Sequence, residues 1–169
     1  MLRHPRLRHP LLLYWLPVLL WAGFMFTMST DIGGPRHTSR IITPILRFLY
    51  PAISEHAIGQ VHFLVRKCAH LTEYAVFALL FWRAVRRPAW PETRPWAWSA
   101  AFSTVLAAGA FAITDEWHQT FVPVREGHPV DVLLDTVGAS IGITVAWGLD
   151  GWSRRRTARA RASSTAAAN

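Results

Sequence analysis

Residues 115–142 of the chain read DEWHQTFVPVREGHPVDVLLDTVGASIG. An acidic segment with a His and a Gln leads through a loop containing Pro, Arg and Gly into an apolar segment that still carries Asp135. A second polar cluster, KCAHLTEY at residues 67–74, also opens an apolar run. Ionisable side chains are costly in apolar segments of membrane length, so they usually face a protein interior or a water-filled cavity. The two clusters predict a polar site inside or just above a membrane helix bundle.

The composition favours an integral membrane protein. The chain has 169 residues, of which 51% are hydrophobic and nine are Trp, yet its formal net charge is +8. A chain of this length fits one domain or one small bundle. The Arg clusters flank apolar runs, as topology signals do, and no zinc-finger spacing or RNA-binding signature accompanies them. We therefore expect the lipid bilayer as a partner and no nucleic acid. The single cysteine, Cys68, excludes an intrachain disulfide.

Four apolar segments are predicted to cross the membrane. They cover residues 11–28, 65–82, 96–114 and 132–149. Each approaches the roughly 20 residues that span a hydrocarbon core. The first segment is longer than the apolar core of a signal peptide and no A-x-A site follows it, which favours an uncleaved anchor. The expected fold is all-α: a multi-pass membrane bundle with four transmembrane helices.

The distribution of Lys and Arg predicts the orientation of the bundle. With the N-terminus inside, the inner segments hold twelve Arg and the outer segments hold six Lys or Arg. The excess of positive charge inside places both termini in the cytoplasm and both polar clusters on the extracytoplasmic side. Residues 1–9 form a basic cytoplasmic N-terminus, residues 10–150 the membrane domain, and residues 151–169 a basic cytoplasmic tail. The Arg, Ala and Ser content of this tail predicts disorder.

The first outer segment, residues 29–64, is predicted to contain an interfacial helix. Its apolar residues recur at helical spacing with two Arg among them: Ile41, Ile42, Ile45, Leu46 and Leu49, with Arg40 and Arg47. Such a pattern is typical of a helix lying at a membrane surface. Pro44 either kinks this helix or occupies its first turn with Thr43 as N-cap. Ser54 is a candidate N-cap for a helix that continues into the second span.

Two further helix faces carry chemistry. Lys67, His70, Glu73 and Tyr74 fall within about 120° of one face. A cluster of this kind either binds a ligand or forms interhelical hydrogen bonds that stabilise the bundle.

The third segment has a stripe of small residues on nearly the same face as Asp115 and Gln119: Ala97, Ala101, Thr104, Ala108 and Ala112. This stripe predicts close packing against a neighbouring helix, with the two polar residues directed into the bundle.

The fourth segment completes the predicted site. Asp131, Asp135, Gly138 and Gly142 lie within about 60° of one another on a helical wheel. Gly138-x-x-x-Gly142 is a weak packing motif alone, but here the same face carries two carboxylates. We expect a polar funnel where the second, third and fourth spans converge under the loop of residues 115–131. Its residues are Lys67, His70, Glu73, Tyr74, Asp115, Glu116, His118, Gln119, Arg125, Asp131 and Asp135.

Arg125 is the only Lys or Arg in that loop. It either forms a bidentate pair with Asp131 or Asp115, or it binds a carboxylate or phosphate of an envelope substrate. His70-x-x-Glu73 and Asp115-x-x-His118 each place an imidazole and a carboxylate three residues apart, a spacing that carboxylate-bridged metal sites also use. The two pairs run in opposite order and Lys67 shares the first face, so we expect neither a metal nor a cofactor. The sequence contains no nucleophile elbow, P-loop or dinucleotide fingerprint.

In these residues the chain resembles the VanZ-like family of small bacterial membrane proteins, over about residues 10–150. The resemblance has three parts: first Lys67, His70, Glu73 and Tyr74; then Asp115, Glu116, Gln119, Phe121, Pro123 and Arg125; then Asp131, Asp135, Gly138 and Gly142. Two residues depart from the family pattern. Arg66 stands where the family often has Asp, and Val124 stands where Gly is common before the Arg.

The resemblance implies a protein of the bacterial cytoplasmic membrane with a role in the cell envelope. The family is named after an accessory protein associated with teicoplanin resistance, so a role in glycopeptide susceptibility is one expectation. An enzyme acting on a lipid-linked or cell-wall substrate is the alternative. In that case His70 or His118 is the general acid or base, Asp115 or Glu116 its partner, and Lys67 or Arg125 the anion-binding residue. A proton- or ion-coupled carrier is a third reading, which four spans without an inverted repeat disfavour. The oligomeric state and any catalytic residue stay open.

Overall fold

The computed structural model describes residues 10–30, 34–87, 94–122 and 128–168. Within these ranges the chain forms helices and no strand, which confirms the all-α prediction. The five helices are α1 (Pro10–Met28), α2 (Pro35–Leu49), α3 (Glu55–Arg86), α4 (Trp98–Gln119) and α5 (Pro129–Ala168). The predicted spans fall within α1, α3 and α5 and overlap α4, and the predicted interfacial helix is α2.

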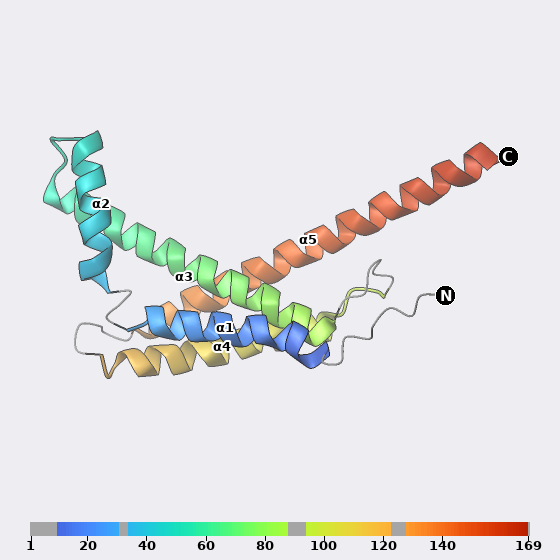
Figure 1. The fold of residues 1–169 in the computed structure, drawn as a ribbon, viewed down its shortest axis with the longest axis horizontal. Helices are drawn as coiled ribbons and strands as arrows, with labels where there is room; N and C mark the ends of the chain where they lie inside the picture. Colours follow the sequence, from blue (N-terminus) through green and yellow to red (C-terminus); the bar gives the residue numbers. More distant parts are fainter. Residues whose placement is uncertain (1–9, 31–33, 88–93, 123–127, 169) are drawn as a thin grey trace.

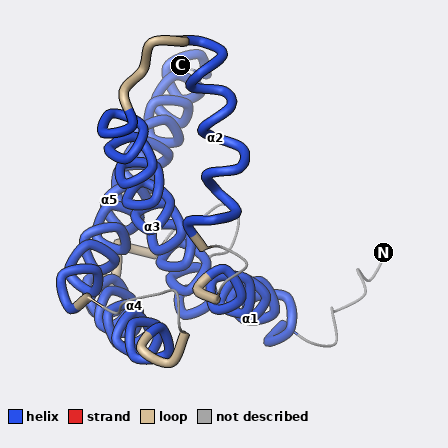
Figure 2. The backbone as a smooth tube through the Cα atoms, turned by 90° about the vertical axis from the view of Figure 1, so that its left-hand side faces the viewer, coloured by secondary structure: helices blue, strands red, loops and turns tan. Residues whose placement is uncertain are grey.

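Helix α3 is the centre of the bundle. It packs against α1, α2, α4 and α5, and α4 also packs against α5. The bundle helices α1, α3, α4 and α5 run in alternating directions, so the end of α4 and the start of α5 lie at the same end of the molecule (Figure 1). The end-on view shows α3, α4 and α5 grouped together and α1 to one side (Figure 2).

The closest helix contact is between α3 and α5. A Cβ atom added to Gly138 would lie 2.6 Å from the carbonyl oxygen of Leu71, and one added to Gly142 would collide with the backbone of Ala75. Two glycines one turn apart on α5 thus face two residues one turn apart on α3. Glycine is required here because any side chain would push the two backbones apart. The Gly138-x-x-x-Gly142 pattern is therefore a packing motif in this fold.

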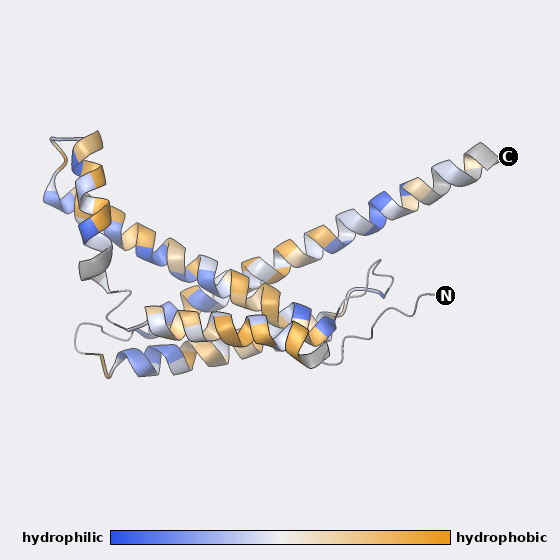
Figure 3. Ribbon diagram, in the orientation of Figure 1, coloured by the Kyte–Doolittle hydropathy of each residue, from blue (hydrophilic) through white to orange (hydrophobic). Residues whose placement is uncertain are grey.

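Helix α4 has the reverse of the polarity of a helix on the surface of a soluble protein. From Ala101 onward the predicted stripe is buried, since Ala101, Thr104, Ala108, Ala112, Asp115 and Gln119 are each at most 4% exposed. Ala97, the first residue of the predicted stripe, is the half-buried N-cap of the helix. The opposite face of α4 is apolar and exposed, with Phe102 at 70%, Leu106 at 64% and Trp117 at 66%. Figure 3 shows hydrophilic residues gathered at the end of α4 that adjoins the start of α5. On α4, small and polar residues therefore face the interior of the bundle, and large apolar residues face outward.

Length and composition support one clear membrane span among the described residues. Residues Pro129–Ala160 form the segment that is both long and apolar enough to cross a bilayer. Leu12–Met28 is a shorter apolar helix. By these measures alone, a buried helix of a soluble protein also passes the test for one span. The four-span arrangement therefore stays a prediction.

Helix α2 lies crosswise at one end of the bundle, beside the first turns of α3 (Figure 1). Its N-cap is Gly34 and Pro44 lies inside it, so the alternative with Thr43 as N-cap is wrong. The Thr43 hydroxyl instead lies 3.0 Å from Nε2 of His62, which ties α2 to α3. At the start of α3, Ser54 Oγ accepts a hydrogen bond from the backbone N–H of Ala57 at 3.2 Å, as its predicted N-cap role requires.

The C-terminal tail differs from the sequence expectation. Helix α5 continues through residues 151–168, where composition predicted disorder. Arg and Ala have high helix propensity, and a helix that is already nucleated extends at low cost. Near the end of the apolar segment, Arg154 is bonded to Asp150 one turn earlier at 2.7 Å. This pair marks where α5 leaves the bundle.

The glycine contact predicts a position-specific loss of stability. We expect Gly138→Leu to destabilise the protein by about 1–3 kcal/mol or to prevent folding, because overpacking forces α3 and α5 apart. Gly148→Leu on the same helix is the matched control, since nothing lies within 4 Å of the added Cβ. Thermal unfolding of the purified variants in detergent compares them. Equal tolerance at the two positions contradicts the close contact.

Candidate functional site

The site begins with an ion pair between α3 and α5. Lys67 Nζ donates a hydrogen bond to Asp131 Oδ1. The two side chains are 20% and 10% exposed, so water screens the pair only in part. Lys67 also lies over the ring of Phe63, with 5.3 Å between Nζ and the ring centroid. The Lys67–Asp131 contact joins α3 to the first turn of α5. It lies at one end of the α3–α5 seam, the line along which these two helices meet.

One turn further along the seam, His70 and Asp135 form a second pair. His70 Nδ1 lies 3.1 Å from Asp135 Oδ1, and the Asp135 side chain is fully buried. A carboxylate bonded to one ring nitrogen orients an imidazole and leaves the other nitrogen for a ligand. On α5, Asp135 lies about one turn before Gly138, whose contact with Leu71 brings the backbones of α3 and α5 together. The glycine packing thus places both carboxylates of α5 against the polar face of α3.

Buried polar atoms without partners lie beside this pair. Within the described residues, the Tyr74 hydroxyl and Asp135 Oδ2 have no hydrogen-bond partner. Tyr74 is fully buried, with its ring near those of Phe77 and Phe111. Buried polar groups in proteins almost always have a hydrogen-bond partner, and a buried group without one costs free energy. Both side chains are fully buried, so these atoms lie in the interior of the bundle.

Helix α4 contributes two carboxylates and an amide. Gln119 Nε2 donates to Asp115 Oδ2 at 3.3 Å, and Asp115 is near enough to interact electrostatically with His70 and Asp135. Glu116 Oε2 accepts a hydrogen bond from the backbone N–H of His128 at 2.8 Å. This bond ties the end of α4 to the residue before α5. The acidic end of α4 therefore lies beside the α3–α5 seam, close to His70 and Asp135.

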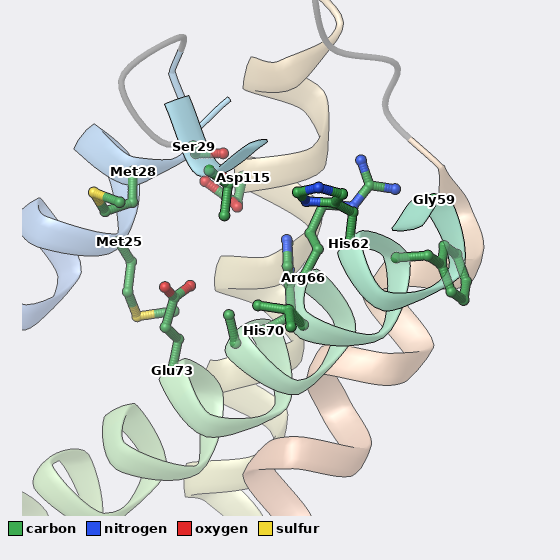
Figure 4. A pocket seen from close by; sticks show the side chains of 13 residues that line it. Met25, Met28, Ser29, Gly59, His62, Arg66, His70, Glu73 and Asp115 are labelled. Atoms are coloured by element: carbon green, nitrogen blue, oxygen red, sulfur yellow. The ribbon is translucent and has the colours of Figure 1, made fainter. Parts of the chain in front are cut away.

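A pocket of about 360 Å³ lies on the other side of α3 (Figure 4). Its lining comes from the end of α1, from α2, from α3 and from α4, and includes His62, Arg66, His70, Glu73 and Asp115. His70 belongs to both places, because its ring contacts Asp135 in the seam and also lines the pocket. The predicted site thus has two connected parts, a seam and a pocket.

One predicted residue lies away from the pocket, and another lies outside the described residues. The His118 ring packs on Phe26 of α1, with ring centroids 4.0 Å apart, and it does not line the pocket. Arg125 lies outside the described residues, so its predicted pairing with Asp131 or Asp115 stays a prediction. Asp131 has Lys67 as its partner in the described structure. In the described ranges, no group of three or more His, Cys, Asp or Glu side chains is placed to hold a metal ion.

His62 and Arg66 were absent from the predicted site. Both line the pocket: Arg66 lies one turn before His70 on α3, and His62 lies two turns before it. The signal was present in the sequence, because His62, Arg66 and His70 recur at intervals of four residues. Arg66 was considered only as a departure from a family pattern. The recurrence of polar residues along α3 indicates a second functional face.

The ion pair at the mouth of the seam predicts a measurable coupling. Lys67→Met leaves Asp131 without its cation, and we expect a loss of about 1.5–3 kcal/mol, the range for hydrogen bonds to charged groups. The double variant Lys67→Met/Asp131→Leu loses less than the sum of the single changes. Arg47→Met is the control, because its pair with Glu55 is 56% and 78% exposed and such pairs contribute about 0–1 kcal/mol. Additive losses at Lys67 and Asp131, measured by thermal unfolding, would contradict the pairing.

One comparison with known proteins identifies a family. The model of the VanZ/LLP1 family matches residues 14–150, which contain α1 to α4 and the apolar part of α5. No curated protein and no solved structure matches the chain. Because the family model covers most of the chain, including the seam and the pocket, this protein belongs to the VanZ/LLP1 family.

Proposed function

We propose that the protein is an integral membrane protein that crosses the bacterial cytoplasmic membrane with α1, α3, α4 and α5. One observation carries the proposal: the bundle buries several carboxylates and exposes many of its large apolar residues. Asp135 is 0% exposed, whereas Leu19, Leu106 and Leu133 are each at least 64% exposed. In water such a surface favours aggregation, but in a bilayer it is the expected lipid contact.

Helix α2 fits this placement. It lies across the bundle rather than along it, and Ile41, Phe48 and Tyr50 on or beside it are 67%, 86% and 70% exposed. A helix in this position lies in the membrane plane, with its apolar face in the lipid. The Lys and Arg count then sets both termini in the cytoplasm and the seam and pocket on the outer side.

Cysteine accessibility tests this topology. After replacement of the exposed Cys68 by Ala, we expect His56→Cys to react with an impermeant maleimide in intact cells, because the start of α3 lies outside. Arg155→Cys is the matched control on α5 and reacts only after permeabilisation. Both positions are exposed in the structure, so burial does not account for a difference. The reverse pattern would overturn the orientation.

For the activity, we propose a role in the cell envelope through the seam and pocket, with glycopeptide (teicoplanin) susceptibility as its outcome. The support is family membership together with the cost of the site. Each ionisable group at membrane depth penalises insertion by about 2.5–3.5 kcal/mol on translocon scales. A bundle of small and apolar residues alone would insert more readily. These groups are therefore retained to bind or to react.

A second candidate is an enzyme that acts on a lipid-linked envelope substrate. One observation favours it: Asp135 contacts His70 Nδ1 at 3.1 Å while the same ring lines the pocket. A carboxylate that orients an imidazole next to a binding cavity is the arrangement that general acid–base catalysis uses. In this reading His70 transfers the proton, Asp135 positions it, and Lys67 and Asp131 hold the mouth of the seam.

Expression in a sensitive Gram-positive host tests both candidates. We expect the wild-type protein to lower teicoplanin susceptibility, and His70→Ala and Asp135→Asn to abolish the effect at unchanged membrane abundance. His56→Ala is the control, because it is an exposed histidine on the same helix outside the pocket. Resistance retained in both site variants means that the pair only packs the bundle. Unchanged susceptibility with the wild-type protein removes the glycopeptide role and leaves the enzyme candidate.

A further inference from the structure

The pocket has two walls of opposite charge. Asp115 and Glu73 lie toward α1, where Asp115 is next to Ser29 and Glu73 is next to Met25 (Figure 4). His62 and Arg66 come from the earlier turns of α3, on the side of Gly59. A pocket of about 360 Å³ is at the small end of the range for ligand sites. Its walls therefore fit a small group that carries both charges.

One side chain of each wall, Asp115 and Arg66, has binding capacity left. Asp115 is 4% exposed, Gln119 donates to its Oδ2 atom, and the Ser29 hydroxyl is its other polar neighbour. The Oδ1 atom keeps acceptor capacity, because a carboxylate oxygen has two lone pairs. Arg66 is exposed to the pocket, and it forms no ion pair with any residue that the structure describes. His62 is already oriented by its contact with Thr43 of α2. A ligand would thus find an acceptor at one wall and a bidentate donor at the other.

The rest of the lining is apolar and reaches the exposed surface of the bundle. Met25 and Met28 of α1 and Phe63 and Val65 of α3 complete the pocket. Phe63 and Val65 are 56% and 40% exposed, so the apolar lining continues onto the surface that we assign to lipid. Arg66 and Asp115 lie at the outer ends of the proposed spans of residues 65–82 and 96–114, whereas Glu73 lies about midway along its span. An amphiphile therefore fits this geometry better than a soluble zwitterion.

We propose that the pocket binds the head group of a zwitterionic phospholipid that carries a primary ammonium and a phosphate, an ethanolamine phospholipid. The ammonium donates to Asp115 and Glu73, and the phosphate accepts from Arg66 and His62. The acyl chains leave the pocket past Phe63 and Val65. This proposal rests on the proposed membrane placement, and it names the ligand class of the same site.

Charge and hydrogen bonding distinguish this ligand from other lipids. A purely anionic head group would meet two carboxylates on one wall and be repelled. A trimethylammonium group carries the positive charge but no N–H, so Asp115 Oδ1 would stay without a donor. The ethanolamine head group satisfies both walls at once. The preference among the three head groups is therefore the signature of the site.

Equilibrium titration of the purified full-length protein in detergent tests the proposal. The probes are short-chain phosphatidylethanolamine, phosphatidylcholine and phosphatidylglycerol, with tryptophan fluorescence or native mass spectrometry as the readout. We expect phosphatidylethanolamine to bind at least about tenfold more tightly than the other two. Arg66→Gln and Asp115→Asn each weaken its binding by about tenfold or more, whereas Arg66→Lys weakens it less because the charge remains. Arg40→Gln, at an exposed Arg of α2 outside the pocket, is the matched control.

The Arg66→Gln variant distinguishes an effect on binding from an effect on folding. Its side chain is exposed, so we expect Arg66→Gln to unfold at the wild-type temperature even if Asp115→Asn is destabilised. Equal affinity for the three lipids, or full affinity in Arg66→Gln, overturns the proposal. Soluble phosphoethanolamine that binds as tightly as the lipid overturns the lipid assignment. Binding to the purified protein needs no resistance phenotype, so loss of the glycopeptide role leaves this result standing.

Discussion

The contact between the backbones of α3 and α5 determines the rest of the structure. Gly138 and Gly142 allow Leu71 and Ala75 to approach within a distance that no side chain would permit. Because the carboxylates of α5 lie on the same face as these glycines, the approach brings them against the cationic face of α3. The ion pair and the His–Asp pair are therefore consequences of packing as much as of charge. In lipid, where burial of apolar surface gives no driving force between helices, such close packing is what brings helices together.

Helical periodicity predicted which faces meet but not which residues pair. The small stripe of α4 and the Asp and Gly face of α5 follow directly from a wheel, and the structure buries both. A wheel gives the angle of a residue about the helix axis and contains no information on how far one helix is shifted along another. Asp131 was one of two candidate partners for Arg125, which lies outside the described residues, and the wheel did not indicate that Lys67 contacts Asp131 across the seam. Axial shift comes from backbone contacts such as that of Gly138 with Leu71, which no single helix displays.

The pocket was harder to predict than the seam. It needs the end of α1 and part of α2 to fold back beside α3, and no pattern within one segment indicates that return. The amphipathic pattern of α2 predicted a helix but left its partner open, and the hydrogen bond of Thr43 with His62 supplies that information. Arg66 shows the same limit. In the sequence it is a cation next to Lys67. In the structure the 100° between neighbouring residues of a helix places Arg66 at the pocket and Lys67 in the seam.

His70 gives the two sites a physical connection. Its ring contacts Asp135 in the seam and also forms part of the pocket wall, so a charge placed in the pocket acts on the α3–α5 pair. Asp115 lies within electrostatic range of both members of that pair and lines the same pocket. A ligand that neutralises Asp115 therefore changes the field at His70 and Asp135 without touching the seam. Binding in the pocket and the state of the buried pair are coupled through these two side chains, whichever of the proposed activities the site performs.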